Sequence, residues 1–470
     1  MTRWVTNELA EYAVGSRFSD YPAEVVAKAK LLILDNLGCM MGGVQSALGQ
    51  AMLRALMGMG EGGNASAVGT RARLRATDAA LFNGTTANAL DYDETLEGIG
   101  HPSSSVIPAA LAAGEDRGID GKRLIDAILV GYDVGNRVGR AIQPTYERLK
   151  RVWCVGTWQT MGAVASAAKA IGLNLEQTLN AYGTAGATAP LPNTQKWGWE
   201  LSERPIHWAK EPTGWPSSTG TLAALLAEQG FVGNRFILDG EKGFWAMAGS
   251  DRCDFDAMTR NLGTSFEVLG LSIKPYSCCR WQHAALDCIV DLKNRYELMA
   301  SQVEAVAIYS FDWVQAFQVY GPRDMVDAEF SFPHSVTMLL HGVEPGPAWF
   351  DSAALNASSF SEYSKRVTVH LDKNLNEIYH TQGKIAARVE LKLRSGDMLM
   401  AGSDSPLGSP EKPIKAADIE AKFIRLSEPL IGRAAANEIV DRVAHLEELR
   451  DIRELIRLTV GNPAIAVARH

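Results

Sequence analysis

The chain has 470 residues, with 46 basic and 54 acidic side chains and hence a formal net charge of −8. Hydrophobic residues make up 46% and charged residues 21%, a globular composition that excludes a disordered or collagen-like chain. The acidic balance argues against a nucleic-acid-binding protein, which normally presents a basic face, but it allows an anionic small-molecule substrate held by a few local cations.

Neither a leader nor a membrane span is visible in the sequence. The first residues, MTRWVTNELAEYAVG, contain no apolar core of a secretory signal, and the apolar stretch 31–41 is interrupted by Asp35 and Asn36. The 6 cysteines form no C-x-x-C pair, and the adjacent Cys278 and Cys279 have the wrong spacing for zinc. We therefore expect a cytoplasmic protein with reduced thiols, without a metal and without a membrane partner.

Apolar residues recur at helical spacing through the first 265 residues. One segment begins at Tyr21-Pro22 and ends at Gly42-Gly43, and Asp120 is a candidate N-cap for a later one. Two Ala-rich segments, 156–171 and 220–229, carry small residues at close spacing, which lets helices approach closely. We expect both to pack in the middle of a helical domain.

The pattern changes after about residue 266. Segments 303–311, 366–371 and 387–393 alternate apolar and polar residues, and Ser395-Gly396-Asp397 predicts a hairpin turn into 398–400. Helical stretches at 281–296 and 331–342 lie between them, so we expect a small α/β unit. A Pro/Gly/Ser linker at 404–413 is followed by amphipathic helices, which indicates that the tail returns to the first domain.

Common nucleotide and hydrolase motifs give little support. Gly58-Met-Gly60-Glu-Gly-Gly63 matches G-x-G-x-x-G, but a helix-like segment precedes it where a dinucleotide site needs a strand, so we interpret it as a helix-ending turn. The sequence contains no P-loop, no G-x-S-x-G and no H-E-x-x-H. Nucleotide-binding, serine-hydrolase and zinc-protease functions therefore lose their usual support.

An acidic stretch carries most of the functional information. Residues 91–101 contain four acids, a threonine and a histidine. Asp91 and Thr95 are four apart and would share a face of a helix that Gly98 and Gly100 end. His101-Pro102 would then begin a new helix, with serines 103–105 as potential caps, so that a histidine lies beside a helix N-terminus that attracts anions. The alternative is a capped helix junction with a solvated acidic turn.

Two basic neighbourhoods accompany this stretch. Residues 272–283 contain Lys274, Arg280 and His283, and the proline after Lys274 keeps that lysine out of helical conformation. Residues 208–215 place Lys210 between aromatic residues. Cations in irregular structure, opposite a His/Asp/Thr cluster, suit a di- or tricarboxylate, whereas the alternative is ordinary surface lysines.

These residues resemble the MmgE/PrpD family, which includes 2-methylcitrate dehydratase, cis-aconitate decarboxylase and iminodisuccinate epimerase. The resemblance begins with D-x-D-[DE]-T, H-P-S and V-I-P-A-A-L-A at residues 91–112. It extends in order through LDNLG at 34–38, GTLAALLAEQGF at 220–231, IKPYSCCR at 273–280 and AEFSFP at 328–333.

The resemblance implies an α+β fold. Its large helical domain would comprise residues 1–265, completed by 405–470, and a smaller α/β lid domain of residues 266–404 would be inserted between them. It further implies a homodimer, no organic cofactor or metal, and a small polycarboxylate substrate bound between the domains.

The resemblance also implies the active-site residues. Thr95 would hold the substrate, and Tyr320 is the candidate acid. We expect His101 to be the base, oriented by Asp91. The cations expected to clamp carboxylates are Lys274, Arg280 and Lys210.

Further candidate substrate-binding residues are positions where the chain departs from the family. Trp153 stands where many members carry a histidine, and Cys279 stands where some members do. His283 is a candidate as well, although its apolar helical surroundings favour a structural role.

Three functions are compatible with these residues. Our first expectation is a hydro-lyase that removes an α-proton and eliminates water, as 2-methylcitrate dehydratase does. The alternatives are an epimerase of an amino- or imino-dicarboxylate and a decarboxylase of the cis-aconitate type. A non-catalytic helical dimer is disfavoured because Asp91, Thr95, His101 and Lys274 are all present.

Overall fold

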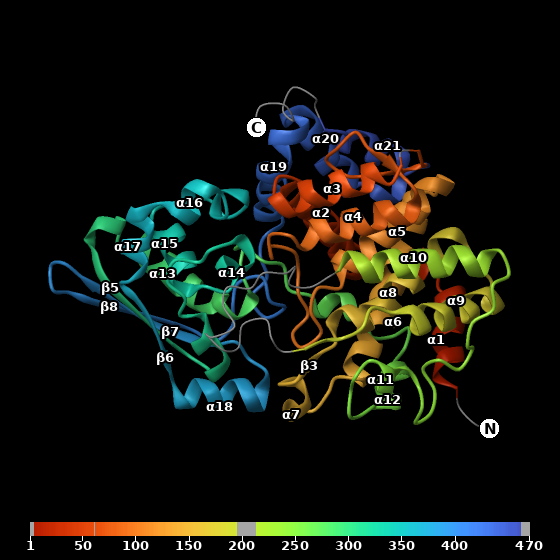
Figure 1. The fold of residues 1–470 in the computed structure, drawn as a ribbon, viewed down its shortest axis with the longest axis horizontal. Coiled ribbons are helices and arrows are strands. Elements are labelled where there is room, and N and C mark those ends of the chain that lie inside the picture. Colours follow the sequence, from red (N-terminus) through yellow and green to blue (C-terminus); the bar gives the residue numbers. More distant parts are fainter. Residues whose placement is uncertain (1–3, 61, 195–212, 462–470) are drawn as a thin grey trace.

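The computed structural model describes residues 4–60, 62–194 and 213–461. The chain forms a large helical lobe and a smaller lobe built around a four-stranded sheet (Figure 1). The fold is therefore mostly helical with a small sheet, in agreement with the predicted α+β class.

The helical lobe is built mainly from the first half of the chain. Asp120 accepts a hydrogen bond from the Arg123 amide and caps helix α6, as predicted. The short helix α7 (Tyr146–Leu149) and strand β3 (Val152–Trp153) follow α6. The longer helices are α1 (Val5–Gly15), α2 (Ala23–Val44), α3 (Ala47–Gly58), α4 (Ala76–Asn88), α5 (Ser103–Arg117), α6 (Gly121–Ala141), α8 (Val155–Ile171), α9 (Leu175–Thr188) and α10 (Gly214–Glu228).

Small residues allow the central helices of this lobe to touch. A Cβ atom at Gly135 of α6 would lie 2.7 Å from the Gly162 Cα of α8. One at Gly220 of α10 would lie 2.5 Å from the Val164 nitrogen of α8. Because side chains longer than hydrogen would separate these backbones, the small-residue pattern confirms the predicted packing of α8 and α10 inside the lobe.

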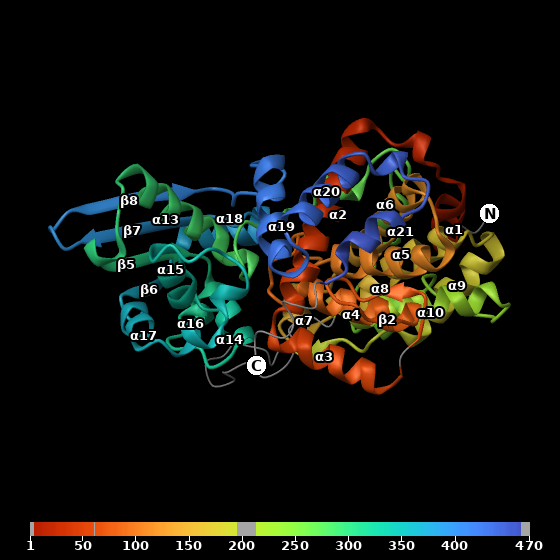
Figure 2. The ribbon, with the colours of Figure 1, turned by 90° about the horizontal axis from the view of Figure 1, so that it is seen from above.

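The smaller lobe contains the predicted hairpin and two further strands. In the sheet order β6-β5-β7-β8, β5 pairs parallel with β6 and antiparallel with β7, and β7 pairs antiparallel with β8. Helix α13 (His283–Arg295) packs against β7 and β8, and α15 (Phe332–Leu340) packs against β6 (Figure 2). The strands are β5 (Val303–Ser310), β6 (Val367–Leu371), β7 (Ala387–Leu393) and β8 (Met398–Ser403).

The end of the chain returns to the helical lobe, as the tail pattern predicted. Helix α19 (Ala416–Ile431) lies between the two lobes and packs against α2 (Figures 1 and 2). Helix α20 (Arg433–Ala444) packs against α2 and α19. The preceding linker is bound to the start of the smaller lobe, because the Ile273 amide donates to the Gly408 carbonyl at 3.0 Å. Gly408 has φ 92°, which glycine adopts readily.

None of the helices in the described ranges is by itself long and apolar enough to cross a bilayer. Helices α2 and α3 pass the same test of length and composition only as a pair, bent by 82°.

Candidate active site

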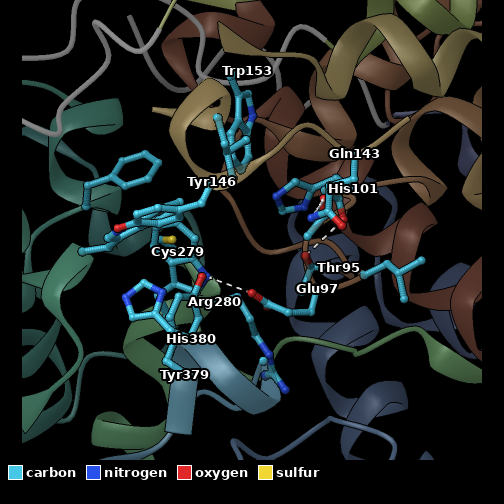
Figure 3. Close-up of a pocket in the computed structure, with 18 residues that line it drawn as sticks. Thr95, Glu97, His101, Gln143, Tyr146, Trp153, Cys279, Arg280, Tyr379 and His380 are labelled. Carbon is cyan, nitrogen blue, oxygen red and sulfur yellow. Dashed lines mark hydrogen bonds between the residues drawn. The ribbon is translucent and has the colours of Figure 1, made fainter. Parts of the chain in front are cut away.

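A cavity of about 340 Å³ lies between the lobes (Figure 3). The helical lobe contributes residues of 95–101 and 143–153, and the smaller lobe contributes residues of 279–281, 379–383 and the single positions Trp313 and Phe330. Figure 3 shows Thr95, Glu97 and His101 on one side of it, facing Tyr146, Cys279 and His380. Groups from distant parts of the sequence therefore meet in one cavity.

The acidic stretch is an irregular loop, so the prediction that Asp91 and Thr95 share a helix face was wrong. Helix α4 already ends at Asn88, and Asp91 has φ 46°. This left-handed conformation cannot continue a right-handed helix, and aspartate tolerates it better than most residues. The loop is instead ordered by hydrogen bonds from the Leu96 amide to the Gly100 carbonyl at 2.8 Å and from the Thr95 hydroxyl to the same carbonyl at 3.1 Å.

His101 is buried and lies between two carboxylates. Its Nδ1 lies 2.9 Å from the Glu94 carbonyl oxygen and 3.2 Å from Asp93 Oδ1, and its Nε2 lies 3.6 Å from Asp91 Oδ1. The Glu94 carbonyl can only accept, so Nδ1 carries a proton and Nε2 is the basic nitrogen of the neutral ring. The orienting contacts therefore come from Asp93 and the Glu94 backbone, and Asp91 faces the nitrogen that would exchange a proton.

The N-terminus of α5 is capped by the acidic loop, and the prediction that serines 103–105 act as caps was wrong. Pro102 is at the N-cap position, and the Ser103 amide donates to the Glu94 carboxyl. The Ser104 hydroxyl donates to Asp93. Pro102 has no side-chain acceptor, so the buried Ser103 amide of the first turn is bound by a residue of the preceding loop instead.

The carboxyls of Asp93 and Glu94, which bond to the first turn of α5, have pKa values shifted in opposite directions. Burial alone would raise the pKa of Asp93, but the protonated form of His101, which also bonds to this carboxylate, and the Lys274 ammonium outweigh burial and hold that pKa below its usual range. Burial, together with the neighbouring Asp93 carboxylate, raises the pKa of Glu94 to about 8. Glu94 is thus a neutral acid at pH 7, and Asp93 is the ionised partner of the histidine.

Replacing Glu94 with Gln should change how stability depends on pH. Free glutamate titrates near 4.5, so the folded state binds this proton more tightly than the unfolded chain, and stability is lost as pH rises from about 5 through 8. Glu94→Gln removes this contribution and keeps an acceptor for the Ser103 amide. We expect the free energy of unfolding, measured by urea titration, to fall less steeply between pH 5 and 8.5 in this variant than in the wild type. The exposed Glu411→Gln is the control, and an unchanged pH slope in Glu94→Gln would contradict the prediction.

Lys274 is fully buried and paired with Asp91. Its Nζ lies 2.5 Å from Asp91 Oδ1 and donates to the Asp91 backbone carbonyl at 2.8 Å. A two-way backbone bridge between Thr95 and Ser272, with both N–O distances 2.8 Å, fixes the lysine segment against the acidic loop. The ammonium group therefore compensates the charge of Asp91, and it also lowers the pKa of Asp93.

The same carboxylates could in principle surround a metal ion. One ligand atom each from Asp91, Asp93 and His101 lies within 4.8 Å of the others. However, the Lys274 ammonium already contacts Asp91 at 2.5 Å, and a cation would compete with it. The donor set therefore fits an internal ion-pair network better than a metal centre, and we derive no step through a metal.

A second buried lysine, from the C-terminal helix α19, supports both segments. Lys422 Nζ donates to the carbonyls of Tyr92 at 2.6 Å and Lys274 at 3.1 Å, and it lies 2.7 Å from Asp35 Oδ1. Burial by itself would lower the pKa of Lys422, but the Asp35 carboxylate raises it above its usual range. This residue therefore holds the acidic loop and the Lys274 segment together from behind the cavity.

Arg280 is the cation of the smaller lobe that lines the cavity. Its guanidinium donates to the carbonyls of Leu407 at 2.7 Å and Pro406 at 3.2 Å, so the linker fixes it in place. Burial lowers its pKa to about 10, which leaves it charged at neutral pH. Glu97 also lines the cavity and accepts from Trp281 Nε1 at 3.3 Å, and desolvation raises the pKa of its carboxyl.

Several predicted site residues lie in or directly behind this cavity. His101, Thr95, Arg280, Cys279 and Trp153 line it. The Asp91–Lys274 ion pair is fully buried outside the lining, with Asp91 Oδ1 3.6 Å from His101 Nε2.

Two of the predicted residues that the structure describes, Tyr320 and His283, do not line the cavity. Tyr320 is 41% exposed, and its hydroxyl donates to the Val367 carbonyl at 2.8 Å, away from the cavity lining. His283 is buried behind Arg280, with Nε2 3.2 Å from the Cys278 carbonyl, and burial holds its pKa well below the usual range. Lys210 lies outside the described residues.

Sequence reasoning missed two groups of residues. The first is Asp93, which contacts His101 and was present in the D-x-D motif two positions after Asp91. The second is the aromatic lining, which carries no spacing signal because its members come from four separate segments. These residues are Tyr146, Trp281, Trp313 and Tyr379.

Comparisons with known proteins agree with the resemblance found in the sequence. The MmgE/PrpD N-terminal domain model matches residues 7–255, and the MmgE/PrpD C-terminal domain model matches residues 276–447. A cis-aconitate decarboxylase from Aspergillus terreus is 26% identical over 97% of this chain and 95% of its own length. The cis-aconitate decarboxylases of Mus musculus and Homo sapiens are 24% and 23% identical, each over 98% of this chain and over 94% and 95% of their own lengths. The chain therefore belongs to the MmgE/PrpD family.

Proposed function

We propose that this protein is a lyase that decarboxylates a small unsaturated acid carrying at least two carboxylates. The observation that carries the proposal is the position of His101 at the cavity wall, with Nδ1 at the Glu94 carbonyl and Nε2 facing the Asp91–Lys274 pair. The names of the similar proteins favour decarboxylation over the dehydration that the sequence led us to expect first.

The bond changes of such a reaction suit these groups. In a β,γ-unsaturated acid the bond to the departing carboxylate breaks, and its electron pair moves through the double bond onto a carbon that is conjugated with a second carboxylate or with an aromatic ring. Carbon dioxide leaves, and one proton is added to carbon. A positioned general acid contributes about 10²–10⁴-fold to such a proton transfer. In this proposal protonated His101 donates the proton from Nε2, and Asp93 stabilises its charged form.

Cations beside the cavity would stabilise the developing negative charge. The Arg280 guanidinium is held rigidly by the Pro406 and Leu407 carbonyls, and such preorganised charge does not have to reorient during the reaction. The Lys274 ammonium, 2.5 Å from Asp91, offsets the negative potential that this carboxylate would otherwise impose on an anionic substrate.

We further propose that residues 266–404 act as a lid on the helical domain formed by 1–265 and 405–470. The cavity is lined from both lobes, and Tyr146 of the helical lobe stacks on Trp313 of the smaller lobe with ring centroids 5.3 Å apart. Substrate entry would require these rings to separate, and closure would exclude water from the carbanion.

The family resemblance also supports a homodimer as a proposal. The helical lobe exposes apolar side chains at Phe231, Val232 and Phe236, which are 53%, 75% and 52% accessible. Such a group of surface residues suits a contact with a second copy. Light scattering after size exclusion should give a mass near twice 50.9 kDa.

Proton NMR in D₂O tests the proposed reaction. The panel contains cis-aconitate, benzylidenesuccinate (in which phenyl replaces one aconitate carboxylate), 2-methylcitrate, citrate and iminodisuccinate. We expect a product with one carboxyl fewer and one deuterium on carbon, with carbon dioxide released. No decarboxylation of either unsaturated acid would contradict the proposal.

Dehydration remains the second candidate because the neutral form of His101 is a base. With its proton on Nδ1, Nε2 can remove an α-proton, which elimination requires and decarboxylation does not. In the same panel, vinyl signals from citrate or 2-methylcitrate without loss of carbon dioxide would establish this reaction. Deuterium entering the α-carbon of iminodisuccinate without a new product would instead indicate an epimerase.

A further inference from the structure

One side of the cavity is a continuous aromatic wall, defined here as Tyr146, Trp281, Trp313 and Tyr379. All four line the cavity. The ring centroids of Tyr146 and Trp313 are 5.3 Å apart with an interplanar angle of 21°, and those of Trp281 and Trp313 are 5.1 Å apart at 65°. Tyr379 completes the wall at 6.2 Å from both tryptophans.

Packing and hydrogen bonds hold this wall in place. The fully buried Phe311 stacks on Tyr379 from behind, at a centroid distance of 3.9 Å and an angle of 10°. Trp313 Nε1 donates to the Tyr146 hydroxyl at 2.6 Å, and this bond joins the two lobes. The wall is thus a built apolar surface opposite His101 rather than a chance gathering of side chains.

The charged groups of the cavity do not provide for three carboxylates. Within the parts of the chain that the structure describes, the lining has one permanent cation, Arg280, together with His101 and His380. His380 Nε2 is bound to Asp312 Oδ1 at 3.0 Å. The Glu97 carboxyl also lines the cavity and interacts electrostatically with Arg280. At the wall, the cationic side chains of the described residues already have acidic partners: His380 is paired with Asp312, and Lys150, whose Nζ lies 4.2 Å from the Tyr146 ring centroid, is paired with Glu147 at 3.0 Å. A third carboxylate placed there would therefore lose hydration without gaining an unpaired cation from these residues.

We propose that the substrate carries an aromatic or extended unsaturated apolar group where a tricarboxylate would carry its third carboxylate. The carboxylates lie toward His101, Thr95 and Arg280, and the planar group packs against the wall of Tyr146 and Trp313. Rings prefer offset-stacked or edge-on contacts at centroid distances of about 4.5–7 Å, which such a wall can provide. This inference names the substrate class of the proposed lyase and rests on that proposed function.

Two inert ligands with the same succinate core test the inference. Tricarballylate carries a carboxymethyl group where benzylsuccinate carries a benzyl group, so the pair isolates the disputed position. Calorimetric titration of the full-length protein should give benzylsuccinate a dissociation constant at least tenfold lower than that of tricarballylate. An equal or tighter affinity for tricarballylate would overturn the inference.

Substitutions in the wall locate the effect. Trp313→Leu should weaken benzylsuccinate at least tenfold and tricarballylate less than threefold. Tyr146 is 36% exposed, so Tyr146→Leu gives a second test that does not depend on tolerance of the Trp313 change. The matched control is Trp4→Leu, because Trp4 is an exposed tryptophan at the N-cap of α1. This variant should leave both affinities unchanged. Retained benzylsuccinate preference in both wall variants would overturn the inference.

The readout separates this inference from the proposed reaction. Neither ligand has a double bond beside a departing carboxylate, so their affinities do not depend on turnover. A preference for benzylsuccinate without decarboxylation in the NMR panel would refute the proposed reaction. The assignment of the aromatic wall as the binding surface for an apolar group would still hold. Decarboxylation of cis-aconitate together with a preference for tricarballylate would refute only the aromatic substrate class.

Discussion

Replacing His101 with Asn should lower kcat by about 10²–10⁴-fold, the usual contribution of a positioned acid or base. The amide of Asn can still bond to the Glu94 carbonyl, but it cannot donate or accept a proton at the position of Nε2. The assay follows the unsaturated acid converted in the NMR panel under single-turnover and steady-state conditions. Because the substitution removes proton transfer rather than binding, KM should change far less than kcat.

The control for this variant is His370→Asn, at an exposed residue of β6 that does not line the cavity. It should retain the wild-type rate. Turnover of His101→Asn within threefold of wild type would remove His101 from the mechanism. Circular dichroism and the cooperativity of unfolding show whether the variant is folded. Its affinity for benzylsuccinate shows whether the cavity is intact.

Replacing Lys422 with Met should destabilise the fold by about 3–5 kcal/mol, the usual effect of removing one partner of a buried ion pair. The loss leaves the Asp35 carboxylate without its partner at 2.7 Å and leaves the Tyr92 and Lys274 carbonyls without their donor. Urea unfolding at pH 7, monitored by circular dichroism, measures the free energy. Catalysis should also suffer because both carbonyls belong to segments that carry site residues.

Two further variants make this prediction specific. Lys415→Met, at the exposed N-cap of the same helix, should change the free energy of unfolding by less than about 0.5 kcal/mol. Asp35→Leu combined with Lys422→Met removes both charges and should recover part of the loss. Equal stability of the Lys415 and Lys422 variants would show that the buried pair does not matter for folding.

The sequence predicted those features that depend on local pattern. The N-cap at Asp120, the hairpin through Gly396 and the close packing of two Ala-rich helices all follow from spacing within a few residues. The site residues His101 and Thr95 were found because a compact motif carries them. The junction between α4 and α5 was expected, with His101 inside it.

The remaining features depend on contacts between distant segments. The loop at Asp91 could not be distinguished from a helix by spacing, because the left-handed conformation of one residue decides it. The α5 cap comes from Glu94 rather than from the serines at its own start. The aromatic wall joins α7, Trp281, Trp313 and α18 (Lys373–Gln382), which no periodicity connects. Tyr320 was selected by resemblance alone, and its position follows from the Val367 contact.

The role of Lys422 has a consequence for the order in which the protein is synthesised. Residues 91–101 leave the ribosome early, and Lys274 follows, but the ammonium that joins their backbones belongs to α19, near the end of the chain. Until translation has passed this helix, the Asp35 carboxylate lacks its counter-ion and the two halves of the site lack their common donor. A nascent chain that stops before residue 416 lacks Lys422, so the loop of residues 91–101 gains this donor only after about nine tenths of the polypeptide has been synthesised.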